Sequence, residues 1–361
     1  MTAPGAGSIK TVHIVQRMAP GGIETLVLDL IGDNHNPSMV FSLESTADAL
    51  VASWPALAQH DQKLVGFDRK EGLSPALIVS IARRLRSIQP TTVIAHHVGP
   101  LLYGGAAARL AGVPKLIHVE HDVWHYRNPT NRVVSKICGR VLRPDHIAVS
   151  NQVAAGMRAI FPSSSITVIP PGIDMARFTL QERSTARSRI GIDPSLRIVG
   201  TIGRLVPVKS QATMLAALCR LPETIHAVIV GDGPERTRLA EYIRQNRIDD
   251  RVHFLGHRDD IESILPAFDV FCLPSLNEGL PRSVLEAQAC GVPVVASDVG
   301  GLGDAVCQDS GRLVPPANHE ALAKALSEVL TQGVGAAGPR AFVERKFSLT
   351  STLDAYRRIC A

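Results

Sequence analysis

Aromatic residues, paired cysteines and long apolar runs are scarce in this sequence. Aromatics make up 4% of the 361 residues, which argues against a binding surface built from stacked rings. The six cysteines are scattered, with no C-x-x-C pair and no histidine array nearby, so we expect reduced, mostly buried thiols rather than disulfides or a zinc site. The longest apolar runs, such as residues 227–230, have the length of a strand and cannot span a bilayer.

The first residues and the charge pattern bear on localisation. Residues 1–8 are small and polar and show no signal-peptide pattern, so we expect a protein that is cytoplasmic or peripheral on the inner face of the membrane. The net charge is +5, and the excess lies in the first half. Four cations there are spaced to share one face of a helix: Arg132, Lys136, Arg140 and Arg143. That face is either an ordinary solvated surface or a site for anionic lipid or a lipid-linked phosphate, and both interpretations stay open. No nucleic-acid-binding motif is present.

Strand-like and helix-like segments alternate along the whole chain, which is typical of parallel α/β sheets. The sequence predicts strands at residues 11–15, 92–95, 115–119, 146–149, 166–169, 197–202, 227–230, 252–255, 270–273 and 292–296. Each half opens with a strand, a glycine loop and a helix. We therefore predict two Rossmann-like, doubly wound domains over residues 1–172 and 173–340. The polar segment 172–196 is the predicted linker, and residues 341–361 form a helix expected to pack back on the first domain.

Two glutamates eight positions apart, Glu278 and Glu286, frame the most informative run of the chain. An apolar strand precedes Glu278, and Gly279-Leu280-Pro281 then lead into a helix that carries Glu286. Peptide N–H groups around Gly279 and Leu280 are expected at the start of that helix, where they favour a phosphate. A carboxylate further along the helix can accept hydrogen bonds from a pair of hydroxyls. A phosphate seat between two carboxylates suits a nucleotide sugar.

This run, S-x-x-E-G-L-P-x-x-x-L-E-A-x-A-C-G-x-P-V-V-A-S, resembles the E-x7-E signature of the retaining GT-B glycosyltransferases of family 4, which include glycogen-synthase-like and α-mannosyltransferase-like members. Residues 203–210 resemble the family's G-R-L-x-x-x-K-G segment, with Ser210 in place of the last glycine. Residues 231–235 resemble its G-D-G-P-E turn, and Gly21 and Gly22 lie in a segment similar to its G-G-x-E loop. The resemblance is dense from Gly203 to Gly301 and thin in the first half.

The resemblance implies an acceptor-binding first domain, a donor-binding second domain and a central cleft that the two domains face. It implies that Arg204 and Lys209 clamp a diphosphate, that Glu286 holds ribose hydroxyls and that Glu278 contacts the sugar. The expected donor-binding residues are Gly21, Gly22, Arg204, Lys209, Gly256, His257, Gly279, Leu280, Pro281, Val284 and Glu286. Family members also carry a histidine near the donor sugar, for which we select His121. His118 and His125 lie close enough in sequence to remain alternatives among the 13 histidines, and His97 remains one because it ends a strand that faces the cleft.

The implied reaction is retaining transfer of a hexose from a UDP- or GDP-sugar to a cell-envelope, exopolysaccharide or lipid-linked glycan, with His121 and Glu278 as the catalytic candidates. No D-x-D motif is present, so we expect no metal and no cofactor beyond the donor itself. No G-x-G-x-x-G follows a strand, which excludes a nicotinamide-dependent dehydrogenase. A non-catalytic nucleotide-sugar-binding scaffold and a GT-B-fold nucleotide-sugar epimerase are the alternatives.

Overall fold

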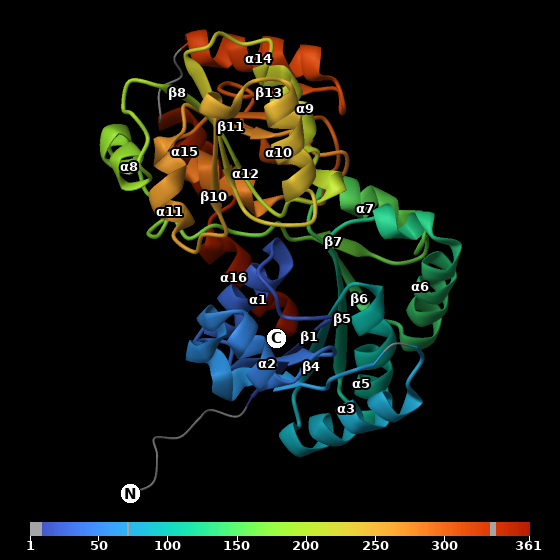
Figure 1. Ribbon diagram of the computed structural model, residues 1–361. Coiled ribbons are helices and arrows are strands. Elements are labelled where there is room, and N and C mark those ends of the chain that lie inside the picture. The colour runs from blue at the N-terminus through green and yellow to red at the C-terminus, as the bar shows by residue number, and fades with distance from the viewer. Residues whose placement is uncertain (1–8, 71, 333–336) are drawn as a thin grey trace, which may run out of the picture. The chain divides into compact units, whose positions relative to one another are not determined.

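The computed structural model describes residues 9–70, 72–332 and 337–361, in two compact units (Figure 1). Unit 1 contains the residues up to Pro170 together with Thr352–Ala361, and unit 2 is Pro171–Ser351. Residues 1–8, for which the sequence predicts no signal peptide, lie outside the described residues. Within the described ranges, no helix combines the length and the apolar character needed to cross a membrane.

Unit 1 is a seven-stranded parallel sheet in the order β3-β2-β1-β4-β5-β6-β7. The strands are β1 (Thr11–Val15), β2 (Ser38–Ser42), β3 (Leu64–Gly66), β4 (Thr92–His96), β5 (Lys115–Glu120), β6 (Asp145–Ala148) and β7 (Ile166–Val168). The helical segments are α1 (Gly22–Gly32), α2 (Ala47–Ser53), η1 (Pro55–Lys63), α3 (Pro75–Ile88), α4 (Val98–Pro100), η2 (Leu101–Gly105), α5 (Ala106–Ala111), η3 (Trp124–Arg127), α6 (Pro129–Leu142) and α7 (Asn151–Arg158).

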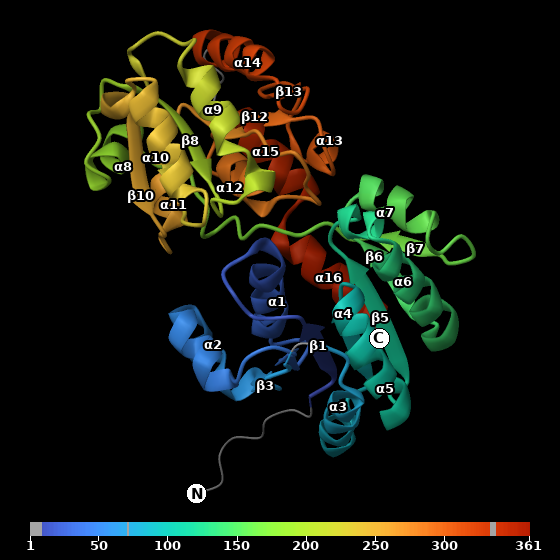
Figure 2. The same cartoon turned by 45° about the vertical axis from the view of Figure 1, so that its right-hand side comes forward.

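Both faces of this sheet are buried, because alternate residues of each strand enter different cores. Val12 and Ile14 of β1 join Leu85 of α3 in one core, while Val15 joins Ile31 of α1 in the other. Figure 2 shows α3, α5 and α6 on one side of the sheet and α1 and α2 on the other. The doubly wound arrangement predicted from the sequence is therefore confirmed for this unit.

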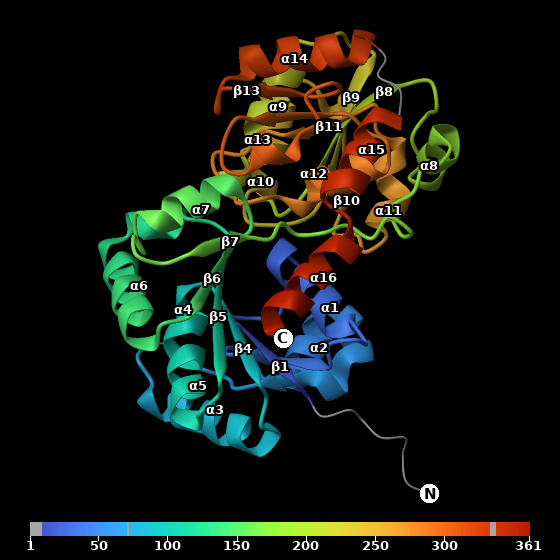
Figure 3. The ribbon, with the colours of Figure 1, turned by 180° about the vertical axis from the view of Figure 1, so that it is seen from behind.

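The end of the chain completes unit 1. Residues Thr352–Ala361 make up most of α16 (Leu349–Cys360) and belong to this unit, so the end of the chain packs back on it as the sequence predicts. The single helix predicted over residues 341–361 is wrong, because α15 (Ala337–Lys346) ends before α16 begins and belongs to unit 2. Arg357 donates from Nε and NH2 to the two carboxylate oxygens of Asp33, at 2.7 and 2.6 Å, and these hydrogen bonds lower the pKa of Asp33. Figure 3 shows this last helix beside α1. A bidentate pair to a buried carboxylate fixes the helix in place.

Unit 2 is a six-stranded parallel sheet in the order β10-β9-β8-β11-β12-β13. The strands are β8 (Arg197–Ile202), β9 (Ile225–Val230), β10 (Val252–Gly256), β11 (Val270–Leu273), β12 (Val294–Ser297) and β13 (Arg312–Val314). The helical segments are α8 (Arg183–Arg189), η4 (Pro207–Lys209), α9 (Gln211–Leu218), α10 (Arg236–Gln245), η5 (Asp249–Arg251), α11 (Ile261–Ile264), η6 (Leu265–Ala267), α12 (Arg282–Ala289), α13 (Leu302–Ala305), α14 (His319–Gln332) and α15 (Ala337–Lys346).

The segment 172–196 is not the simple linker that its polar composition predicts. It contains α8, and Arg187 of this helix is buried, with its NH2 group 2.5 Å from Asp269 and its Nε 3.0 Å from the carbonyl of Ala267. Arg183 donates to the same carboxylate at 2.8 Å. Two arginines of this segment therefore hold the helix on unit 2, one through a buried ion pair and the other through a half-exposed one.

Candidate active site

In unit 2 the chain reverses its winding direction between β8 and β11, which are adjacent in the sheet. In open parallel sheets, ligands bind at the carboxyl ends of strands at such a switch point. The loop after β8 carries Arg204 and Lys209, and the loop after β11 carries Glu278. The two loops are tied together by a backbone hydrogen bond from the N–H of Leu276 to the carbonyl of Val208, at 2.8 Å. The predicted segments that carry Arg204, Lys209 and Glu278 therefore share one edge of one sheet.

Lys209 and Glu278 are in direct contact. The Nζ of Lys209 donates to Oε1 of Glu278 at 2.6 Å, and the hydroxyl of Ser275 donates to the same oxygen at 2.6 Å. The side chains are 19% and 9% exposed, so the pair is shielded from solvent but still accessible. A partly desolvated ammonium held in one orientation is suited to binding a phosphate or a sugar hydroxyl. Arg204, in contrast, is exposed, and its guanidinium has no ion pair or hydrogen bond among the described residues.

The helix that carries Glu286 begins later than predicted. Its first residue is Arg282, with Pro281 as the N-cap, so Gly279 and Leu280 precede the helix instead of opening it. A residue before proline is sterically driven out of the helical region, which excludes Leu280, and Pro281 has no N–H to offer. Arg282 and Ser283 therefore supply the first N–H groups. Val284 is fully buried, which fits a role in packing.

Glu286 lies one turn into this helix beside Arg282, with 3.6 Å between the Nε of Arg282 and Oε1 of Glu286. Arg282 is itself buried and donates from NH1 to the carbonyl of Gly172 at 2.8 Å. The carboxylate oxygens of Glu286 can accept hydrogen bonds from hydroxyls. At the end of β10, the carbonyl of Gly256 accepts from the N–H of Gly231 at 2.7 Å, and His257 is exposed beside Asp259.

In unit 1 the candidate residues surround a buried carboxylate at the end of β5, Glu120. It accepts hydrogen bonds from Nδ1 of His97, from the hydroxyl of Tyr126 at 2.6 Å and from the N–H of His121 at 3.2 Å. Burial alone would raise the pKa of Glu120, but the nearby His97 and hydrogen bonds from the surrounding histidines lower it well below the usual range. Glu120 therefore remains charged and orients the groups around it.

His121 ends a row of three buried histidines on neighbouring strands. His13 Nδ1 lies 3.2 Å from His96 Nε2, and His96 Nδ1 lies 2.9 Å from His121 Nε2. Burial lowers the pKa of His13 to about 3 and lowers those of His96 and His121 well below the ordinary value, so the row is neutral. A neutral imidazole held in one tautomer can donate to, or accept from, a sugar hydroxyl.

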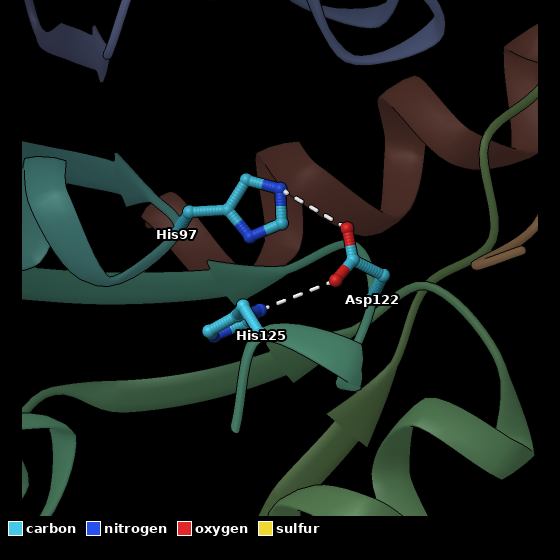
Figure 4. Close-up of side chains that lie close together, drawn as sticks. All are labelled: His97, Asp122 and His125. Atoms are coloured by element: carbon cyan, nitrogen blue, oxygen red, sulfur yellow. Dashed lines mark hydrogen bonds and ion pairs between the residues drawn. The ribbon is translucent and has the colours of Figure 1, made fainter. Parts of the chain in front are cut away.

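The three alternative histidines differ in their burial and in their partners. His118 is fully buried, and its Nδ1 lies 3.2 Å from Nδ1 of His146, so it belongs to the core. His97 and His125 are partly exposed and lie on either side of Asp122 (Figure 4). Gly21 is the N-cap of α1 and Gly22 its first residue, so both lie at the helix start that follows β1, as the sequence predicts.

Two family models match the two halves of the chain. Residues 182–345 match "Glycosyl transferases group 1", and residues 20–177 match "Glycosyltransferase Family 4". The chain belongs to the GT-B glycosyltransferases of family 4.

Solved structures of other proteins share the fold of this GT-B chain. Anabaena HepE in complex with UDP has a TM-score of 0.85 and 24% identity, with 97% of this chain and 99% of that chain covered. Sucrose-phosphate synthase from Thermosynechococcus elongatus has a TM-score of 0.82 and 20% identity, over 97% and 99%. Among curated relatives, the D-inositol 3-phosphate glycosyltransferase of Mycolicibacterium gilvum is 39% identical over 201 residues. The match covers 53% of this chain and 45% of that relative, so the chain spans less than half of the relative's length.

Several residues of this GT-B site are not among those predicted from the sequence. Ser275, Arg282 and Gly300 contact the predicted loops of unit 2, and Glu120 organises the histidines of unit 1. A sequence signal existed for Glu120, because a carboxylate at the end of an apolar strand between histidines is unusual. Nothing local in the sequence indicates the contacts of Arg282, which reach back to Gly172.

Proposed function

We propose that this protein is a retaining glycosyltransferase that moves a hexose from a nucleotide diphosphate sugar to a cell-envelope, exopolysaccharide or lipid-linked glycan acceptor. The observation that carries the proposal is the shielded Lys209–Glu278 pair at the switch point of unit 2, close in sequence to the helix that holds Glu286. Structures of Anabaena HepE include complexes with UDP and with UDP-glucose, which supports a UDP-sugar as the donor here. The name of the Mycolicibacterium gilvum relative adds inositol 3-phosphate to the acceptors worth testing.

In the proposed reaction the chain's own groups stabilise the leaving diphosphate. Arg204 and Lys209 bind its oxygens, together with the N–H groups of the first turn of α12, so the donor needs no metal ion. Glu286 accepts hydrogen bonds from ribose hydroxyls, and Gly256 and His257 bind the base through backbone groups. Glu278 and His121 contact the transferred sugar. The departing diphosphate takes the proton of the incoming acceptor hydroxyl on the same face of the sugar, which retains the configuration.

A donor and acceptor panel tests this function. Nucleotide diphosphate release would be measured for UDP- and GDP-hexoses, with and without polyol phosphate and lipid-linked acceptors, and the products analysed for anomeric configuration. Release that depends on an acceptor, with the donor's configuration kept in the product, is the expected result. Donor binding without release would indicate a binding scaffold, and a new sugar isomer formed without acceptor would indicate an epimerase.

We also propose that the exposed face of α6 contacts an anionic membrane surface. Arg132, Lys136 and Arg140 of α6 are exposed, as is Arg143, which the sequence places on the same helix face but which is the left-handed C-cap after the last residue of α6. Val133, Ile137 and Val141, one position after three of these cations, are 55%, 57% and 70% exposed. An apolar row beside a basic row suits an interfacial helix, in which the apolar side chains enter the head-group region and the cations meet lipid phosphates.

Charge reversal on this face should abolish vesicle binding. Each cation near an anionic surface contributes about 1 kcal/mol, so the Arg132→Glu, Lys136→Glu, Arg140→Glu variant should bind at least about a hundredfold more weakly. Co-sedimentation with phosphatidylcholine vesicles, with and without phosphatidylglycerol, measures this. The matched control reverses Arg238, Arg244 and Arg247, in and just after α10 of unit 2. Equal binding by both variants would contradict the proposal and show that the α6 face is an ordinary solvated surface.

A further inference from the structure

His97, Asp122 and His125 form a cluster at the carboxyl edge of the sheet in unit 1. His97 follows β4, Asp122 follows β5, and His125 lies in η3. The Nε2 of His97 is 3.7 Å from Oδ2 of Asp122, and the Nδ1 of His125 is 3.2 Å from Oδ1. Figure 4 shows both rings directed at the carboxylate. Within the described ranges, this is the one place where three histidine, cysteine, aspartate or glutamate ligand atoms lie within 4.8 Å of one another.

The remaining nitrogen of each ring faces one second carboxylate. Glu120, with no exposed side-chain surface, accepts from Nδ1 of His97 and lies 3.4 Å from Nε2 of His125. A histidine that binds a metal almost always donates its other N–H to a carboxylate or carbonyl, which fixes the tautomer and aims the free lone pair. Glu120 does this for His97, whereas Nε2 of His125 lies 3.4 Å from a Glu120 oxygen without a hydrogen bond among the described residues. The other nitrogen of each ring lies beside Asp122.

The backbone holds His97 in a conformation that side chains rarely adopt. Its φ and ψ are 72° and 175°, a region that favours glycine, and the helix that follows contains a π-helical turn over Leu101–Gly105. Hydrogen bonds from the N–H of His97 to Val119 and from the N–H of Leu101 to His97 keep this geometry. Strained backbone and π-turns both concentrate at functional sites.

We propose that His97 Nε2, His125 Nδ1 and the Asp122 carboxylate bind one divalent transition-metal ion, with zinc favoured by the ligand set. Two imidazoles and a carboxylate form a three-ligand site that leaves a position open for an oxygen of water or substrate. Zinc–ligand bonds of about 2.0–2.1 Å place tetrahedral ligand atoms about 3.3 Å apart. The ring nitrogens lie 3.2 Å from Oδ1 and 3.7 Å from Oδ2 of Asp122, and one ligand atom of each residue lies within 4.8 Å of the other two.

This site goes beyond the proposed function, because none of its three ligands is assigned to the donor. It revises the expectation of a metal-free protein only for unit 1. That expectation rested on the missing D-x-D motif, which concerns a metal held at the donor diphosphate. The open coordination position provides a Lewis-acidic contact for a hydroxyl or phosphate oxygen.

Zinc titration of the full chain tests the proposal. The protein, free of any histidine tag, is stripped with chelator, desalted and titrated with zinc chloride against a chromophoric chelator. We expect one zinc per chain, at least a hundredfold weaker binding for Asp122→Asn and for His125→Gln, and about 10- to 100-fold weaker binding for Glu120→Gln. Zinc should also raise the melting temperature of the wild type and leave that of Asp122→Asn unchanged.

The chain supplies a matched control in a second histidine pair. His226 Nδ1 and His253 Nε2 lie 3.1 Å apart in unit 2, so His253→Gln removes a paired histidine elsewhere and should keep full zinc binding. Stoichiometry well below one in the wild type, or equal affinity in Asp122→Asn, would overturn the metal site and leave His97 and His125 as partners of carboxylates alone. Donor-dependent nucleotide release is measured separately, so failure of the metal site and failure of the transferase proposal are distinguishable.

Discussion

Lys209→Met is expected to lower kcat/KM for the nucleotide-sugar donor about a thousandfold, which corresponds to about 4 kcal/mol of transition-state stabilisation. The ammonium of Lys209 is held by Glu278 in a shielded site before any donor arrives, so little reorganisation is needed when negative charge develops on the leaving diphosphate. Methionine keeps most of the stem's volume and removes the charge. The loss should fall on kcat more than on KM, because charge on the diphosphate increases in the transition state.

Steady-state nucleotide release measures the effect, and two further variants sharpen it. Lys324→Met removes an exposed lysine from α14 and should leave kcat/KM unchanged. Glu278→Gln keeps a hydrogen-bond acceptor for Lys209 and Ser275 while removing the carboxylate, so it separates positioning of the lysine from direct contact with the sugar. A kcat for Lys209→Met within threefold of the wild type, in a protein with unchanged melting temperature, would exclude Lys209 from the chemistry.

The segments that carry Lys209 and Glu278 could be selected from the sequence, but the contact between the two side chains could not. Lys209 and Glu278 each lie in a segment typical of the family, yet they are 69 positions apart and the sequence suggests separate roles for them. Their contact depends on the register of β8 and β11 and on the hydrogen bond between Leu276 and Val208. The start of α12 could have been placed correctly, because Pro281 alone shows that the helix cannot include Leu280.

The strands of the two sheets also differ in how well the sequence predicts them. All ten predicted strands are present within two residues. Eight of them are not at a sheet edge, where strands of parallel sheets are buried on both faces and are continuously apolar, and the other two, β7 and β10, are edge strands. The strands that were not predicted lie at or next to sheet edges. Two of the unpredicted strands are edge strands of only three residues, Leu64–Gly66 in unit 1 and Arg312–Val314 in unit 2. A strand of that length is too short to show a periodic signal.

Histidine roles in unit 1 depend on where each ring lies in the folded sheet, which the sequence does not report. His118 and His121 are three positions apart, but strand alternation and the strand end put one in the core and the other at the edge. Glu120 orients the other groups, because its carboxylate accepts hydrogen bonds from His97 at the end of one strand and from Tyr126 in a following turn. The donors to this buried carboxylate come from separate segments, so the arrangement exists only in the folded sheet and is not readable from the sequence.

Gly300→Ala is expected to destabilise the protein by about 3 kcal/mol or more and to impair donor turnover in any folded fraction. Gly300 has a φ of 57°, and an ideal Cβ on it would overlap the backbone oxygen of Glu278. The neighbouring N–H of Gly301 donates to the carbonyl of Gly279, so the two loops meet backbone to backbone. Because the overlap is with backbone, relief requires the Glu278 loop to move, which also breaks the contact with Lys209.

Gly303, three positions further on, provides the comparison. It lies in α13 without a positive φ, and a Cβ there would meet nothing within 4 Å. Gly303→Ala should therefore be neutral or stabilising by up to about 1 kcal/mol, since alanine favours helix over glycine. Urea unfolding of both variants gives the free energies, and nucleotide release at saturating donor gives the activity. Equal stability of the two variants would contradict this prediction. It would mean that the Gly300 loop can shift at little cost and that its backbone contact does not fix the position of Glu278 beside Lys209.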